Sequence, residues 1–178
     1  TSQRVLKKIG LFDPFLFLYH DDLDLGWRAA QIDIKSYYVP ASIVYHAESY
    51  NFRWSSKKFY WLERNRRYCL LTHYSKNTYK RIFPYLLQAE ILVWIFYLTK
   101  GFVGPKIRAE LDIIKNKKHI QQKYDELESK KIIPDMELIK SFPDEIFVPK
   151  NVSGGFGSYI FNSLLKKLSR KAKNRIIK

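Results

Sequence analysis

Three aspartates lie close together at the end of an apolar run in the N-terminal part of the sequence. Residues 15–19 are all apolar or aromatic, and they are followed almost at once by Asp21, Asp22 and Asp24. Neighbouring carboxylates repel one another, so their ionisation is costly unless they bind a cation, cap a helix or serve in proton transfer. This cluster is therefore the first candidate for chemistry in the chain.

Three interpretations of the cluster remain open on spacing alone. The acids can complement the N-terminal end of a helix over Leu23–Ile34, where carboxylates cap free N–H groups and stabilise the dipole. Asp22 and Asp24 can be a D-x-D metal motif, although such a motif normally closes a βαβ unit of roughly 30 residues, and only 21 residues precede Asp22. Finally, one carboxylate can be a general base whose pKa is tuned by its neighbours.

The elements that would position these acids follow from the pattern of apolar residues. Residues 15–19 predict a short buried strand in front of the cluster. Two further short strands are predicted over Tyr37–Val39 and Ser42–Tyr45, interrupted at Pro40, which cannot donate to a sheet ladder. From Lys57 onward the pattern becomes helical, opening with serine caps. A long charged helix is expected over Ile107–Lys130.

The most apolar segment of the chain runs from Ile82 to Thr99, between two basic residues. Its 18 residues approach the roughly 20 that are needed to cross a bilayer. Pro84, Gln88 and Glu90 count against a clean span. We expect an interfacial or re-entrant helix here, and a buried core helix is the alternative.

Charge restricts the class of partner. The 178 residues carry a formal net charge of +15, which points to an anionic partner. The segment "SGGFGS" predicts a hinge into a basic amphipathic tail over Tyr159–Lys178, a composition that suits an anionic membrane surface. Nucleic acid is not expected, because no recognised binding motif is present. The single Cys69 excludes an intramolecular disulfide and any Cys-rich zinc site.

Three segments follow one another over Ile9–Arg67: "IGLFDPFLFLYHDDLDLGWRA", "YYVPASIVYHAES" and "YWLERNRRY". In order and spacing they resemble the C-terminal half of inverting glycosyltransferases of the large family two, nearest to the rhamnosyltransferase-like members. The resemblance implies an α/β fold, the C-terminal portion of a GT-A (Rossmann-like) domain, followed by a mainly α-helical extension. It also implies sugar transfer, with inversion, from a nucleotide-sugar donor to a hydroxyl of a saccharide or lipid-linked glycan.

The resemblance assigns roles to the residues of the acidic cluster and of the helix behind it. Asp22 falls on the family's catalytic base, and Asp21 takes the place of that base's partner glutamate. Asp24 matches the second acid. Acceptor binding is expected of Asp21 and Asp24, and also of Trp27 and Arg28 on the following helix.

Two further positions carry expectations from the same resemblance. His46 matches a histidine that approaches the donor diphosphate or its metal, which would be Mg²⁺ or Mn²⁺; a purely structural histidine is the alternative. Asp33 stands where the family commonly has glycine, and Asp tolerates a positive φ better than most residues do.

The expected organisation has three parts. Residues 1–75 would be the acceptor-side part of the catalytic domain, 76–150 a helical extension with the apolar segment 82–99, and 151–178 the hinge and basic tail. The family's donor-binding half has no counterpart here, so a split or truncated enzyme with a separate donor-binding partner is expected. It would lie at the cytoplasmic face of the cell membrane, peripheral or re-entrant. The alternative is a non-catalytic membrane-surface or interaction module.

Overall fold

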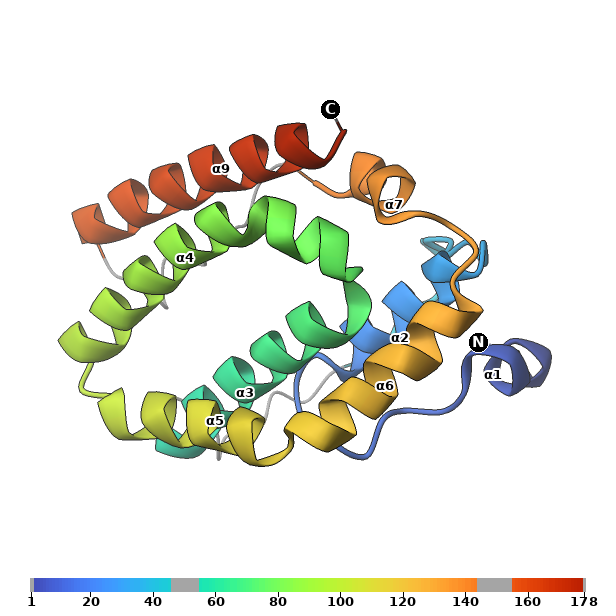
Figure 1. Ribbon diagram of the computed structural model, residues 1–178, viewed down its shortest axis with the longest axis horizontal. Helices are drawn as coiled ribbons and strands as arrows, with labels where there is room; N and C mark the ends of the chain where they lie inside the picture. Colours follow the sequence, from blue (N-terminus) through green and yellow to red (C-terminus); the bar gives the residue numbers. More distant parts are fainter. Residues whose placement is uncertain (1, 46–54, 144–154, 178) are drawn as a thin grey trace. The chain divides into compact units, whose positions relative to one another are not determined.

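The computed structural model describes residues 2–45, 55–143 and 155–177, with the side chains of the last stretch described from residue 161. Every regular element in these ranges is a helix, and none of them is a strand. The expectation of an α/β, Rossmann-like fold is therefore wrong for the described part of the chain. The chain forms two compact units that interleave in sequence (Figure 1). Unit 1 comprises Thr1–His73 and Phe102–Ile133, and unit 2 comprises Tyr74–Gly101 and Pro134–Lys178.

Unit 1 is built around its longest helix, α3. Its helices are α1 (Gln3–Ile9), α2 (Asp21–Gln31), α3 (Ser56–His73), α5 (Val103–Lys115) and α6 (Lys117–Lys130). The helix α3 packs against both α5 and α6 (Figure 1). The apolar core of the unit joins the segment before α2 to these three helices, through Leu16, Tyr68, Cys69, Ile113 and Ile120.

Unit 2 is built from α4 (Lys76–Thr99), α7 (Asp135–Ser141) and α9 (Gly155–Ile177). The long helices α4 and α9 run side by side (Figure 1). Their directions are opposite, because early Ile82 shares a core cluster with late Ile176, and late Phe96 lies 6.1 Å from early Phe161 between ring centroids. Ile139 of α7 completes this cluster.

Several helices begin and end where the sequence indicates. Ser55 Oγ accepts from Lys58 N at 3.2 Å in front of α3, which confirms the expected serine cap. The single long helix expected over Ile107–Lys130 is wrong, because it is divided into α5 and α6 at Asn116. Residues 155–158 of the expected hinge belong to α9, and residues 153 and 154 lie outside the described residues.

The strand expected over residues 15–19 is wrong, and local geometry explains why. Asp13 Oδ1 accepts from Phe15 N at 2.9 Å, which closes a turn at the Asp-Pro pair. Phe17 has φ 51° and Tyr19 has φ 66°, in the left-handed region that a strand excludes. The segment is therefore a compact irregular loop. We call it the acid loop (residues 15–20) because it leads into the acidic cluster, although it contains no acidic residue itself.

The two strands expected over Tyr37–Val39 and Ser42–Tyr45 are wrong as well. Both segments are irregular, and their side chains face solvent: Tyr38 is 90% exposed and Tyr45 is 95% exposed. A short β-prone segment becomes a strand only where a neighbouring strand pairs with its backbone. The described residues supply no such neighbour.

Candidate functional site

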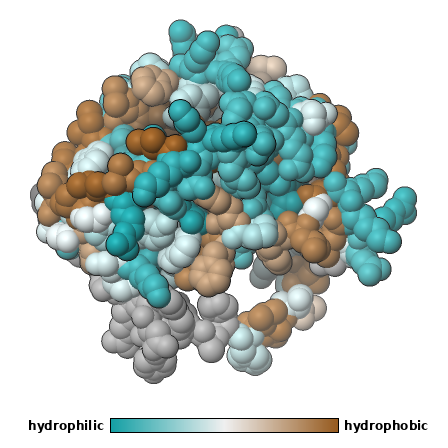
Figure 2. All heavy atoms as spheres, turned by 60° about the horizontal axis from the view of Figure 1, so that its bottom comes forward, coloured by the Kyte–Doolittle hydropathy of each residue, from teal (hydrophilic) through white to brown (hydrophobic). Residues whose placement is uncertain are grey.

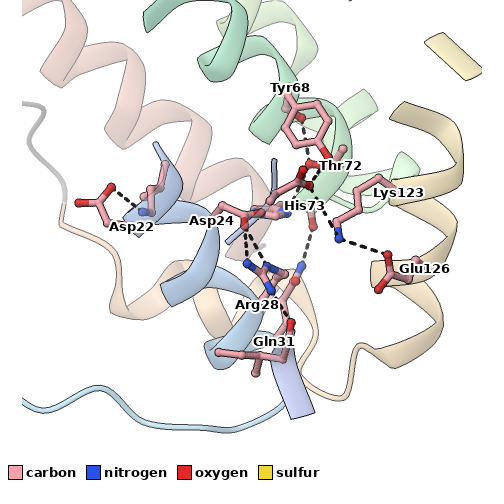
Figure 3. Close-up of polar contacts among 12 residues, drawn as sticks. Asp22, Asp24, Arg28, Gln31, Tyr68, Thr72, His73, Lys123 and Glu126 are labelled. Atoms are coloured by element: carbon pink, nitrogen blue, oxygen red, sulfur yellow. Dashed lines mark hydrogen bonds and ion pairs between the residues drawn. The ribbon is translucent and has the colours of Figure 1, made fainter. Parts of the chain in front are cut away.

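The three aspartates have different environments, although they share the first turn of α2. Asp24 is fully buried, and its Oδ2 accepts from Arg28 Nε at 2.9 Å and from Arg28 Nη2 at 2.7 Å. His73 Nε2 lies 3.1 Å from Asp24 Oδ1. Figure 3 shows these three side chains converging, with Asp22 pointing away from them. Asp24 is therefore part of the interior of unit 1.

Arg28 connects this interior to the beginning of the chain. Its guanidinium donates to the carbonyl of Leu11 at 2.8 Å and also to the carbonyl of Ile9. Gly10, between them, has φ 82°, and a Cβ at that position would lie 3.3 Å from Arg28 Nη1. The close approach of arginine to backbone therefore explains this glycine, as well as the orientation of the α1–α2 connection.

Electrostatics keep the buried aspartate charged and the buried histidine neutral. Burial alone raises the pKa of Asp24, but its contacts with His73 and Arg28 outweigh burial and lower that pKa below its usual value. Burial lowers the pKa of His73, against the opposing influence of Asp24. At neutral pH the cluster therefore consists of one anion, one cation and one neutral imidazole.

Asp22 has the opposite environment, because it is exposed at the tip of α2. Its Oδ1 accepts from Leu23 N at 2.8 Å, so the helix-capping interpretation fits this residue. Capping occupies one carboxylate oxygen, and an ionised carboxylate has two. The general-base interpretation is thus compatible with the same geometry. Asp21 is half-buried beside it.

The acid loop is held by the Arg-Asn pair of α3. Asn65 is fully buried, and Arg64 is nearly so. Arg64 Nη2 donates to the carbonyl of Phe15. Asn65 Nδ2 lies 2.7–2.8 Å from three carbonyl oxygens of the loop, those of Leu16, Leu18 and Tyr19. This pair supplies the backbone partners that the loop cannot obtain from a sheet.

The same loop displays an aromatic ring to solvent. Phe17 is 73% exposed, and its ring centroid lies 5.5 Å from that of Trp61 on α3. The guanidinium of Arg64 lies between two rings, 4.3 Å from the Phe15 centroid and 4.2 Å from the Trp61 centroid. A positive φ at a bulky residue costs about 1–3 kcal/mol, and such strain concentrates at functional positions. We refer to Phe17 and Trp61 as the aromatic pair.

The remaining sequence-based candidates fall in different places. Trp27 is half-buried, with its ring centroid 4.7 Å from that of His73, so it packs on the Asp24 cluster. Asp33 has φ 61°, a left-handed backbone that aspartate tolerates better than most residues do. His46 lies outside the described residues, and its role stays a prediction.

One group of carboxylates in unit 1 can be tested as a metal site. Glu63 Oε1 and Glu110 Oε1 lie 2.5 Å and 2.8 Å from Lys106 Nζ. The lysine ammonium already provides the positive charge between them, so these two glutamates do not fit a divalent ion. Their role is to join α3 to α5.

Sequence reasoning assigned no function to two residues that organise the site, Asn65 and His73. A signal was present in both cases, since each continues the buried line of α3 that includes Tyr68, Cys69 and Thr72 at helical spacing. A polar residue in such a line needs internal partners. Their partners, the acid loop and Asp24, come from a distant part of the sequence.

No known protein family, curated protein or solved structure matches this chain. The candidate site therefore has to be interpreted from its own geometry.

Proposed function

We propose that this chain is the acceptor-side part of a sugar-transferring enzyme, in which Asp22 is the general base. The observation that supports the proposal is the division of labour within the acidic cluster. Asp24 is buried and bound to Arg28, which fixes the start of α2, whereas Asp22 on the same turn is exposed. A general base needs both properties, a fixed backbone and an accessible carboxylate.

The proposed reaction is a single displacement with inversion. The acceptor hydroxyl oxygen attacks the anomeric carbon of the donor sugar, and the bond from that carbon to the nucleotide diphosphate breaks. The diphosphate leaves with the electron pair. Asp22 takes the hydroxyl proton, for which its carboxylate oxygen must approach the hydroxyl to about 2.6–3.2 Å.

The aromatic pair is the proposed contact for the acceptor. Apolar C–H faces of sugar rings pack well on exposed aromatic rings, and Phe17 stands four residues before Asp21 in the sequence. Asp24 and Arg28 are then positioning residues, because their polar atoms already bind one another and the backbone. Trp27 supports the cluster by packing on His73.

The proposal for donor binding rests on the sequence resemblance to glycosyltransferases. A divalent ion, Mg²⁺ or Mn²⁺, would compensate the charge of the leaving diphosphate, with His46 as the residue that approaches it. A donor-binding half is the corresponding partner, and the cytoplasmic face of the membrane is the corresponding location. The saccharide or lipid-linked acceptor would meet the donor at the exposed tip of α2.

The test is sugar transfer by this chain combined with a nucleotide-sugar-binding polypeptide, with Mg²⁺ or Mn²⁺ present. Asp22→Asn keeps the shape and the capping oxygen but cannot take the proton, so the transfer rate should fall by about 10²–10⁴-fold. Asp21→Asn, one residue away in the same turn, is the matched control and should reduce the rate much less. Saccharide binding by Asp22→Asn should equal that of the wild type.

Two results would contradict the proposal. If Asp22→Asn retained the wild-type transfer rate, the cluster would be a helix cap and no more. If Asp21→Asn and Asp22→Asn lost activity equally, the effect would belong to the charge of the turn and not to one base.

A further inference from the structure

The outward face of α4 carries a continuous apolar stripe. Its members are spaced by four residues and then three, and each is about half exposed. Successive steps of four turn the stripe by only about 40° around the helix. We call this set the outer ridge: Phe83, Leu87, Ile91, Ile95 and Leu98.

Among the described side chains, the packing of unit 2 does not use the outer ridge. The core of the unit is built from the other side of α4, where Ile82 and Tyr97 are buried and Leu86 packs on the core cluster. An exposed apolar stripe of this length marks an interaction surface. Figure 2 shows, on the face in view, that apolar side chains reach the surface beside hydrophilic ones.

Basic residues accompany the ridge. Lys76 and Lys80 precede it, four residues apart and with Lys80 three residues before Phe83, and both are exposed. The helix behind α4 is basic too, since α9 has no acidic residue and exposes Lys167, Lys171 and Arg175 on successive turns. An apolar stripe that continues into lysines matches the boundary between acyl chains and anionic headgroups.

We propose that the outer ridge docks unit 2 on an anionic lipid bilayer, with α4 lying in the plane of the membrane surface. The ridge enters the acyl boundary, and Lys76 and Lys80 contact the headgroups. The long-range attraction comes from the net charge of +15. This inference is independent of the role proposed for Asp22, because the outer ridge and its lysines lie in the other unit.

The packing of unit 2 favours this in-plane position over a crossing one. Among the described helices, α4 alone is long and apolar enough to cross a membrane. However, α9 packs along it, so a crossing α4 would take the cations of α9 into the hydrocarbon, where each costs several kcal/mol. An in-plane helix keeps α9 on the aqueous side.

The first experiment measures binding of the full chain to phosphatidylcholine vesicles with and without phosphatidylglycerol. The chain has a matched pair of exposed leucines: Leu87 in the ridge is 51% exposed, and Leu111 on α5 of unit 1 is 50% exposed. Leu87→Glu should reduce partitioning to anionic vesicles by about tenfold or more. Leu111→Glu should leave it near the wild-type value, and circular dichroism should show both variants folded.

A second experiment separates the in-plane position from a crossing one. Phe83→Cys and Leu98→Cys, each labelled with a depth-sensitive fluorophore, place probes about 22 Å apart along the helix. Equal, shallow quenching by brominated lipids supports the proposal, and depths that differ by most of this separation overturn it. Cys69 is buried, which favours labelling at the introduced cysteine.

Other results of the first experiment would also overturn the proposal. Equal losses in Leu87→Glu and Leu111→Glu would mean that apolar exposure in general drives binding. If the wild-type chain formed a dimer that Leu87→Glu breaks, and did not bind vesicles, the outer ridge would be the contact with a second copy of the chain. Binding of the chain to RNA and not to vesicles would mean that its positive charge serves nucleic-acid binding.

Discussion

The two units are stabilised by different kinds of interaction. The interior of unit 1 holds charged and polar side chains that bind one another, such as Asp24 with Arg28 and Glu63 with Lys106. The shared core of unit 2 consists of isoleucines from three helices, and its exposed ridge is apolar as well. Buried polar networks fix one geometry but tolerate no missing partner, whereas apolar cores adapt. These different properties match the two proposals, in which unit 1 would position reacting groups and unit 2 would contact lipid.

The largest stability effect is expected in unit 1, from Asp24→Asn. This change keeps the volume but leaves the buried guanidinium of Arg28 without its counter-charge, which typically costs about 3–5 kcal/mol. Urea unfolding followed by hydrogen exchange in α2 and α3 measures it. The control is Glu126→Gln, which removes surface pairs with Lys130 and Lys123 that are worth about 0–1 kcal/mol each. Equal effects in the two variants would contradict the polar description of unit 1.

A smaller effect is expected in unit 2 from Ile139→Ala. Ile139 is buried with Ile82 and Ile176, and its truncation leaves a cavity that costs about 2–3 kcal/mol when neighbours relax partly. Hydrogen exchange should increase in α4 and α9. Met136→Ala on the same short helix is the control, because Met136 is exposed. If Met136→Ala weakened the unit as much, the apolar core would not be its main source of stability.

The smallest effect is a dependence on pH that should be confined to unit 1. The pKa of His73 is lowered from its usual 6.5, so the unfolded chain binds a proton that the folded chain does not. Stability should therefore fall as the pH drops below 6.5. A second loss should follow below pH 3.8, because the pKa of Asp24 is lowered from that value.

Thermal unfolding of wild type and His73→Gln across this pH range tests the assignment. The stability of the variant should fall less below pH 6.5 than that of the wild type. It should still fall to some extent, because burial also lowers the pKa of His20. Identical pH profiles for the two proteins would remove His73 from the explanation.

Helical segments were more predictable than the loops between them. The spacing around Leu23–Ile34 led to α2, and the serine before α3 acts as the cap that the sequence suggested. Periodicity failed for residues 15–19, where an apolar run suggested a strand. The carbonyls of that run bind Asn65, some 46–49 residues later, and local sequence carries no sign of such a partner.

The candidate site was predictable in its residue types but not in its division of roles. Spacing placed Asp24 and Arg28 on one helix behind Asp22, and the resemblance implied acceptor binding by both of these helical residues. Which aspartate becomes buried depends on His73, at the far end of α3. A contact between two helices determines this, and neither helix encodes it alone.

The interleaving of the units also determines the order in which the protein can fold during synthesis. The backbone N–H groups of Ile132 and Ile133 donate to the carbonyl of Gln31, so unit 1 is complete only after the ribosome has passed α4. By then α4 has emerged, while α7 and α9 have not yet left the ribosome. Because chains fold from the N-terminus as they grow, the apolar face of α4 is exposed to its surroundings before α7 and α9 can pack against it. A membrane beside the ribosome would therefore be the first surface that it finds.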